Sequence, residues 1–157
     1  MVKIRKEYTI FLIIISFFAF LLCLQQKYIK KLKLRARKER GLFFLMNQWI
    51  GLKQDNQQIE TYFRKNNYQR IAVYGMGFVG MRLIKELRNT NLNIIYGIDQ
   101  NAANISSDLK LLTLEDELPE VDVIIVTVLG SFQEIYDKLS TKIKCDIVAI
   151  EDIINEV

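Results

Sequence analysis

The chain has 157 residues, half of them apolar, and a net charge of +4, so it is long enough for one domain with a hydrophobic core. It contains no histidine, which excludes Ser-His-Asp catalysis, Cys-His catalysis and histidine metal sites within these residues. The two cysteines, Cys23 and Cys145, have no metal-ligand spacing and form no disulfide framework.

The net charge hides an asymmetry along the chain. Residues 1–40 carry 11 Lys or Arg against 2 acidic residues, whereas residues 41–157 carry 11 Lys or Arg against 16 acidic residues. The positive excess therefore belongs to the N-terminal segment, and the remainder is acidic. We expect no binding of nucleic acid by the folded part of the chain.

An apolar segment follows a short N-terminal tail at residues 1–7. Residues 8–26 form a run of 19 residues without a charge. As a helix, this run would reach roughly 28 Å, close to the thickness of the bilayer hydrocarbon. We therefore expect a single transmembrane helix. A cleaved signal peptide is the alternative, but no A-x-A-like site follows, and Leu22 is too large for the position before a lipoprotein cysteine.

Basic residues flank this run on both sides. Three precede it, and eight follow it between Lys27 and Arg40. The positive-inside bias predicts an N-terminus outside the cytoplasmic membrane and a cytoplasmic remainder of the chain. Residues 27–41 are predicted to form a basic helical stem. Residues 27–40 would bind anionic lipid, unless they serve only as a flank that fixes topology.

Residues 42–66 are predicted to form an amphipathic helical hairpin. Apolar residues recur at spacings of three and four, and the polar residues 53–58 interrupt the pattern. Asp55 and Gln58 have the spacing of a capping box that would open the second helix. We expect the apolar stripe that contains Trp49 to pack against the following domain or a partner rather than to bind a ligand.

From Tyr68 onward, predicted strands alternate with predicted helices. The strands are expected at residues 70–74, 93–98, 109–112, 121–128 and 146–150, and the helices at 79–89, 114–117 and 131–138. Thr113 with Asp116, and Ser131 with Glu134, have the spacing of helix N-caps. Near-continuous apolar strands between helices indicate a parallel sheet covered on both faces.

Right-handed crossovers give these strands the order 3-2-1-4-5. The predicted fold class is therefore α/β. It is a half-Rossmann parallel sheet in residues 67–157, preceded by a single transmembrane helix and a helical hairpin.

A glycine motif, Gly75-x-Gly77-x-x-Gly80, stands between the first strand and the helix that follows it. The first glycine of such a motif allows a tight turn, the second lets the backbone approach a pyrophosphate, and the third lets the helix pack closely. Free N–H groups and the helix dipole then favour a phosphate. The predicted binding residues here are Gly75, Met76, Gly77, Phe78, Val79 and Gly80.

Two further positions are predicted to complete the binding site. Asp99 ends the second strand, where an acidic group accepts hydrogen bonds from ribose hydroxyls and disfavours a 2′-phosphate. Thr127, followed by Gly130 and Ser131, lies where the strand order reverses, the usual place for a ligand. NAD or a nucleotide-sugar is the expected ligand. The alternatives are a glycine motif that is only a tight turn, and a Ser131 that only caps a helix.

The segments "IAVYGMGFVG" (71–80), "IIYGIDQN" (94–101) and "VDVIIVTV" (121–128) resemble the NAD(P)-binding Rossmann-like domains of nucleoside-diphosphate-sugar epimerases and dehydratases. They are also similar to the sugar-nucleotide-binding domains of bacterial sugar acetyltransferases, to small Rossmann domains of bacterial surface-polysaccharide biosynthesis proteins and, more distantly, to CoA-binding domains. The resemblance implies a nucleotide ligand. It implies, as partners, membrane proteins of polysaccharide assembly at the inner face, and it is compatible with a homo-oligomer.

The chain also departs from these families. Short-chain sugar epimerases use Tyr-x-x-x-Lys, and none of the seven tyrosines here has a lysine four places on. We therefore expect a binding module without complete catalytic machinery. One alternative is a small NAD-dependent epimerase or oxidoreductase completed by a partner or oligomer, with Tyr74 or Ser131 as acid or base. The other is a scaffold that binds no nucleotide and docks through residues 42–63.

Overall fold

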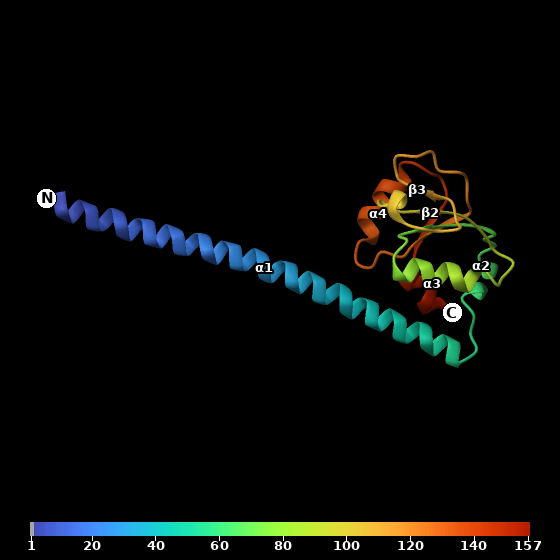
Figure 1. Ribbon diagram of the computed structural model, residues 1–157. Coiled ribbons are helices and arrows are strands. Elements are labelled where there is room, and N and C mark those ends of the chain that lie inside the picture. The colour runs from blue at the N-terminus through green and yellow to red at the C-terminus, as the bar shows by residue number, and fades with distance from the viewer. Residues whose placement is uncertain (1) are drawn as a thin grey trace. The chain divides into compact units, whose positions relative to one another are not determined.

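The computed structural model describes residues 2–157, without the side chains of residues 2–7, 9, 10, 13 and 14. The chain divides into two units, Met1–Arg40 and Gly41–Val157. The side chains of the predicted tail, residues 1–7, and some of those in the predicted membrane run thus lie outside the described part. Figure 1 shows the course of the chain from the first helix into the α/β unit.

The first helix, α1, runs without interruption over Val2–Gln54. It contains the apolar run, the basic stem and the first helix of the predicted hairpin. Among the residues that the structure describes, no helix combines the length and the apolarity needed to cross a membrane.

The end of α1 differs from the sequence prediction. Asn56 has a φ of +56°, and Gln57 donates its N–H to the carbonyl of Leu52 at 2.8 Å, the bond that closes a helix in a Schellman motif. Asp55 therefore terminates α1 and does not open the next helix. The predicted capping box is wrong, because α2 (Glu60–Lys65) begins without a side-chain hydrogen bond at its cap.

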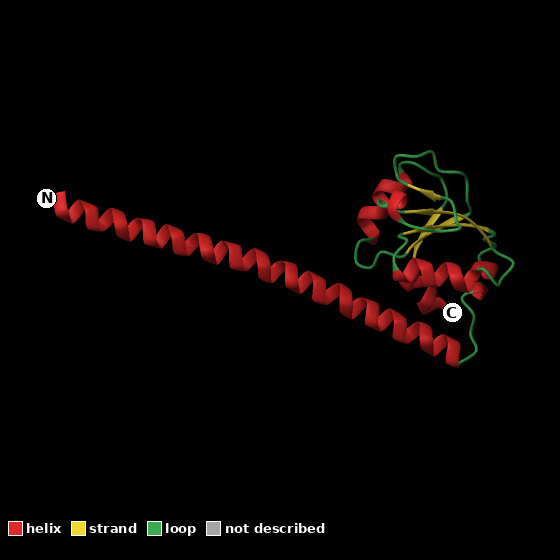
Figure 2. Cartoon of the chain, in the orientation of Figure 1, coloured by secondary structure: helices red, strands yellow, loops and turns green. Residues whose placement is uncertain are grey.

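The sheet has five parallel strands in the order β3-β2-β1-β4-β5, which confirms the predicted α/β class and strand order. Figure 2 shows the strands of the sheet with the helices around them. In chain order the strands are β1 (Arg70–Tyr74), β2 (Asn93–Ile98), β3 (Leu111–Leu112), β4 (Val123–Val126) and β5 (Asp146–Ala149). The first two have the predicted bounds. Because the strands are parallel, the ends of β1, β2 and β4 meet at one edge of the sheet.

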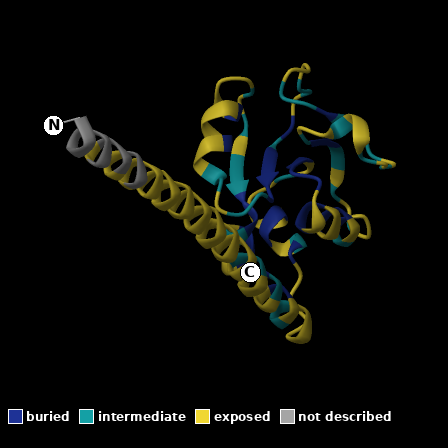
Figure 3. Ribbon diagram, turned by 60° about the vertical axis from the view of Figure 1, so that its left-hand side comes forward, coloured by how far each residue is buried: buried dark blue, intermediate teal, exposed yellow. Residues whose placement is uncertain are grey.

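The two faces of the sheet are covered by different helices. Side chains alternate along a strand, so Ile71 of β1 points to one face and Ala72 to the other. The last turns of α1 cover the first face with α2, α3 (Phe78–Leu87) and α5 (Ile150–Glu156), and α4 (Phe132–Ser140) covers the second. In Figure 3 the buried strands accordingly lie between helices that are exposed on their outer sides.

The apolar stripe of residues 42–52 packs into the first of these two cores. Leu45 is 2 % exposed and Trp49 is 6 % exposed, and both belong to the cluster that contains the residues of α2 and α3. The expected packing role of the stripe is confirmed. Phe43 and Ile50 lie outside this cluster and are exposed.

The helix expected at residues 114–117 is a turn. Asp116 accepts hydrogen bonds from the N–H and the hydroxyl of Thr113 at 2.7 and 2.9 Å, so the pair makes the expected contacts. These bonds lower the pKa of the Asp116 carboxyl, the backbone bond most. The turn does not grow into a helix because Pro119 restricts the residue before it and has no N–H to donate.

The C-terminal segment also differs from the prediction. β5 ends at Ala149, and Ile150 starts α5 rather than ending the strand. Within α5, Ile150, Ile153 and Ile154 are buried at helical spacing in the first core. The described part of the chain also contains one short 3-10 helix, Ala102–Asn104, after β2.

Candidate functional site

The glycine turn starts directly after β1. Gly75 has a φ of +95°, in the left-handed region that favours glycine. A Cβ at this position would lie 2.6 Å from Cγ2 of Val128 and 2.9 Å from Oγ1 of Thr127. Backbone conformation and packing therefore both require a glycine here, and the tight turn that the sequence predicts is present.

Gly80 allows α3 to approach this turn closely. A Cβ at Gly80 would lie 2.0 Å from the carbonyl oxygen of Gly75, a distance that no side chain tolerates. This is the close helix packing that the third glycine of the motif is expected to permit. The fold itself thus explains two of the three glycines.

Gly77 is not explained by the fold. Its φ of −78° and ψ of −164° form an extended backbone that any residue adopts. A Cβ there would meet no atom within 4 Å. Neither conformation nor packing therefore selects glycine at this position. The space beside it is open, as the approach of a bound group to the backbone would require.

The backbone N–H groups at the start of α3 lie next to this space. The first bond of the helical ladder runs from the N–H of Met81 to the carbonyl of Gly77 at 3.0 Å. The N–H groups of Phe78, Val79 and Gly80 come before it and have no acceptor within the helix. They carry the positive end of the helix dipole. Phe78 is 86 % exposed, whereas Val79 is buried in the first core.

Asp99 lies beside the glycine turn, as the sequence predicts, but its carboxylate also holds the turn in place. Its Oδ2 accepts the N–H of Met76 at 2.8 Å, and its Oδ1 accepts the N–H of Asn101 at 2.8 Å. Each carboxylate oxygen keeps a second lone pair for another donor, such as a ribose hydroxyl. Met76 itself is 5 % exposed, and its Sδ packs against Gly97. Of the predicted binding residues, Met76 therefore offers neither its amide nor its side chain to the open space.

Thr127 is buried behind the turn. Its hydroxyl lies 2.7 Å from the carbonyl oxygen of Gly75 and 3.0 Å from that of Tyr74, and its N–H donates to Tyr74 at 2.9 Å. Only 5 % of the residue is exposed. The structure thus gives Thr127 the role of fixing the turn from behind.

A small crevice opens at the same edge of the sheet, between the ends of β1 and β2 and the helix α4. Its volume is about 220 Å³, and Gly75, Asp99 and Ser131 contribute to its lining. Ser131 occupies the N-cap position of α4, but its side chain makes no capping hydrogen bond. The expected capping of α4 by the Ser131 side chain is therefore wrong, and Ser131 lines the crevice.

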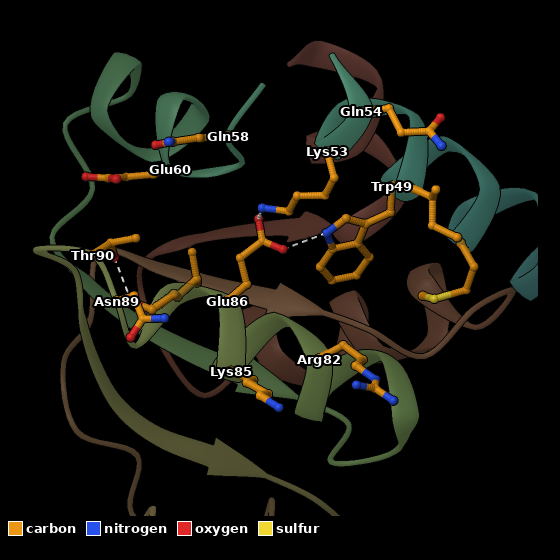
Figure 4. A pocket seen from close by; sticks show the side chains of 13 residues that line it. Trp49, Lys53, Gln54, Gln58, Glu60, Arg82, Lys85, Glu86, Asn89 and Thr90 are labelled. Carbon is orange, nitrogen blue, oxygen red and sulfur yellow. Dashed lines mark hydrogen bonds and ion pairs between the residues drawn. The ribbon is translucent and has the colours of Figure 1, made fainter. Parts of the chain in front are cut away.

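A larger groove of about 860 Å³ separates the last turns of α1 from α3 (Figure 4). Glu86 of α3 reaches across it, accepting the indole N–H of Trp49 at 2.8 Å and pairing with Lys53 at 2.5 Å. The sequence pattern did not reveal this network, because its members come from two separate helices. These two contacts connect the end of α1 to α3, the helix that follows the glycine turn.

Burial, and next the charge of Asp146, raises the pKa of the Cys145 thiol to about 11, so the thiol is protonated at neutral pH and a poor nucleophile. No group of three or more metal-ligating side chains occurs within the described part of the chain.

Comparison with protein-family models, with curated proteins and with solved structures finds no significant match to this chain.

Proposed function

We propose that the chain is a membrane-anchored, Rossmann-like module that binds a nucleotide or a nucleotide-sugar. The observation that carries this proposal is the open space at Gly77, beside the three leading N–H groups of α3. A glycine that neither packing nor conformation requires is expected where a ligand occupies the place of a side chain. A diphosphate fits this place, because the amides and the helix dipole favour negative charge.

Asp99 supports a nucleotide over a free phosphate. Its carboxylate is fixed by two backbone N–H groups at the edge of the turn, so its position is set before any ligand arrives. A fixed acid next to an anion site accepts hydroxyl groups and repels a second phosphate. NAD and nucleotide-sugars both carry a diphosphate followed by ribose hydroxyls, and both stay candidates for the ligand of this module.

The N-terminal unit supports membrane anchoring. The run of 19 uncharged residues at 8–26 suits one span, and the side chains described within it are exposed rather than packed. The basic residues that follow, up to Arg40, would stay on the cytoplasmic side and contact anionic lipid. An anchor of this kind raises the local concentration of the module near other membrane proteins.

In this proposal the partner carries out the chemistry, and the module holds the nucleotide for it at the inner face of the membrane. The resemblance to domains of surface-polysaccharide biosynthesis favours membrane proteins of polysaccharide assembly as partners.

Calorimetry on the detergent-solubilised full chain tests the binding step with NAD, UDP-glucose, GDP-mannose and CoA. We expect at least one of them to bind, and Gly77→Val to weaken that binding more than tenfold, because the added side chain fills the place of the phosphate. Gly51→Val is the matched control, since a Cβ at Gly51 also meets no atom within 4 Å and lies away from the turn. Binding of none of these ligands, or equal binding by the Gly77 variant, would favour the scaffold function.

A further inference from the structure

The crevice between β1 and α4 is lined by a largely buried tyrosine whose hydroxyl stays accessible. Tyr74, the last residue of β1, is only 5 % exposed and lines the crevice. Its hydroxyl makes no hydrogen bond to any described residue. Every fully buried side-chain oxygen in the described part of the chain has a hydrogen-bond partner, so the Tyr74 hydroxyl is not fully buried. The hydroxyl therefore keeps its access through the crevice. Tyr96 of β2, in contrast, donates its hydroxyl to the carbonyl of Pro119 at 2.8 Å.

Charged groups of α4 stand on the other side of the same crevice. Lys138 and Glu134 both line it and pair at 2.6 Å. The pKa of the Lys138 ammonium is raised by its bond to Glu134, then by the charge of Glu134, with a smaller contribution from Tyr74. Lys138 is therefore a cation at neutral pH and lies within electrostatic reach of the phenol. A hydroxyl, an ammonium and a carboxylate thus face one small volume.

We propose that this crevice is the subsite for the sugar of a nucleotide-sugar, with the Tyr74 hydroxyl and the Lys138–Glu134 pair as its hydrogen-bonding groups. The inference rests on the proposed function, since the crevice shares Gly75 and Asp99 with the glycine turn. A ligand whose diphosphate lies at the start of α3 can therefore extend into it. Sugar hydroxyls are both donors and acceptors and match this mixed set of groups.

The size of the crevice distinguishes the two candidate ligands. Its volume of about 220 Å³ lies below the range of roughly 300 to 1,000 Å³ that is typical of sites for drug-sized ligands. One monosaccharide suits such a volume better than the second nucleoside of NAD. The lining also offers Ser131 and Asn101 as polar groups, and Ile135 as an apolar surface for the C–H face of a sugar.

The test compares each nucleotide-sugar with its own nucleoside diphosphate on the detergent-solubilised full chain. UDP-glucose is compared with UDP, and GDP-mannose with GDP, by calorimetry. Tyr74→Phe removes only the hydroxyl, and Lys138→Gln removes an exposed charge, so the second variant keeps the test valid if the first does not fold. Tyr136→Phe is the control, because Tyr136 is exposed on the same helix and does not line the crevice.

We expect Tyr74→Phe and Lys138→Gln to weaken binding of the nucleotide-sugar about 3- to 10-fold, the effect of one lost hydrogen bond, and to change diphosphate binding less than twofold. Unchanged nucleotide-sugar binding, or an equal loss for sugar and diphosphate, overturns the subsite. Binding of NAD without either nucleotide-sugar overturns it as well. In these cases the proposed function stands if Gly77→Val still weakens nucleotide binding more than tenfold. If no nucleotide binds the wild-type chain, the proposed function and the subsite fail together.

Discussion

Replacing Gly80 with alanine tests how closely α3 approaches the glycine turn. The new Cβ would lie 2.0 Å from the carbonyl oxygen of Gly75, well over 1 Å inside ordinary contact. The obstacle is backbone, so no change of rotamer relieves it, and either the helix or the turn has to move. The same substitution at Gly77 meets no atom within 4 Å and serves as the matched control.

The expected loss of stability follows from two opposing effects. Overpacking a well-packed site costs about 1 to 3 kcal/mol, and the upper end applies here because backbone cannot yield. Alanine gains about 1 kcal/mol over glycine within a helix. The net loss is therefore about 2 kcal/mol, which lowers the melting temperature of a domain of this size by about 8 °C. We expect a shift of less than about 3 °C for Gly77→Ala, where only the helix cap changes.

Fluorescence of the single tryptophan provides the assay. Trp49 is buried and donates its indole N–H to Glu86 of α3, so its emission reports the separation of this helix from the rest of the core. Thermal unfolding of the full chain is followed for the wild type, Gly80→Ala and Gly77→Ala. A Gly80→Ala melting point within about 2 °C of the wild type, or an equal loss in Gly77→Ala, would refute the reasoning.

Three further predictions follow from the contacts in the core. Glu86→Ala leaves the buried N–H of Trp49 without a partner and removes the Lys53 ion pair, so urea unfolding should show a loss of about 1 to 2 kcal/mol; no measurable loss would contradict this. Burial raises the pKa of the Tyr96 phenol from 10.0 to about 12, so the folded chain keeps a proton that the unfolded chain releases. The contribution of Tyr96 to stability should be constant up to about pH 10 and be lost between pH 10 and 12, so stability should fall less over this window in Tyr96→Phe than in the wild type; an equal fall in both would be inconsistent with the burial of the phenol. The Cys145 thiol, with a pKa of about 11, should react with iodoacetamide at pH 8 more than tenfold faster after unfolding in urea than in the native chain, as peptide mass spectrometry would show. Equal rates in the two states would contradict its burial.

The sequence was sufficient to predict the sheet because its strands are apolar, short and clearly bounded. β1 and β2 have their predicted limits, and the strand order follows from the handedness of the crossovers. The roles of Gly75 and Gly80 were also predictable, since the motif fixes a turn and a close approach wherever it occurs between a strand and a helix.

The elements that were missed lack a distinct local signal. The apolar residues from Ile147 to Ile154 suit a strand as well as a helix, so the start of α5 at Ile150 depends on where the chain leaves the sheet. Asp55 has the right spacing to cap a following helix, but the left-handed conformation of Asn56 makes it the end of the preceding one.

The contacts of the candidate site are less predictable than its residues. Asp99 was expected beside the turn, but its bond to the N–H of Met76 depends on the register between β1 and β2. The crevice between Tyr74 and Lys138 exists only because α4 crosses the face onto which Tyr74 points. Contacts of this kind join segments that are distant in the chain and depend on the tertiary structure, so no residue spacing in the sequence predicts them.

The most direct test of the central claim observes the backbone amides at the start of α3. In the ¹⁵N-labelled full chain, titration with UDP-glucose or NAD is followed through the amide resonances. We predict that the largest shifts occur at residues 77–80, and that they are lost in Gly77→Val but not in Gly51→Val. Absence of shifts with either nucleotide, or shifts confined to other parts of the chain, would contradict a diphosphate site at the glycine turn.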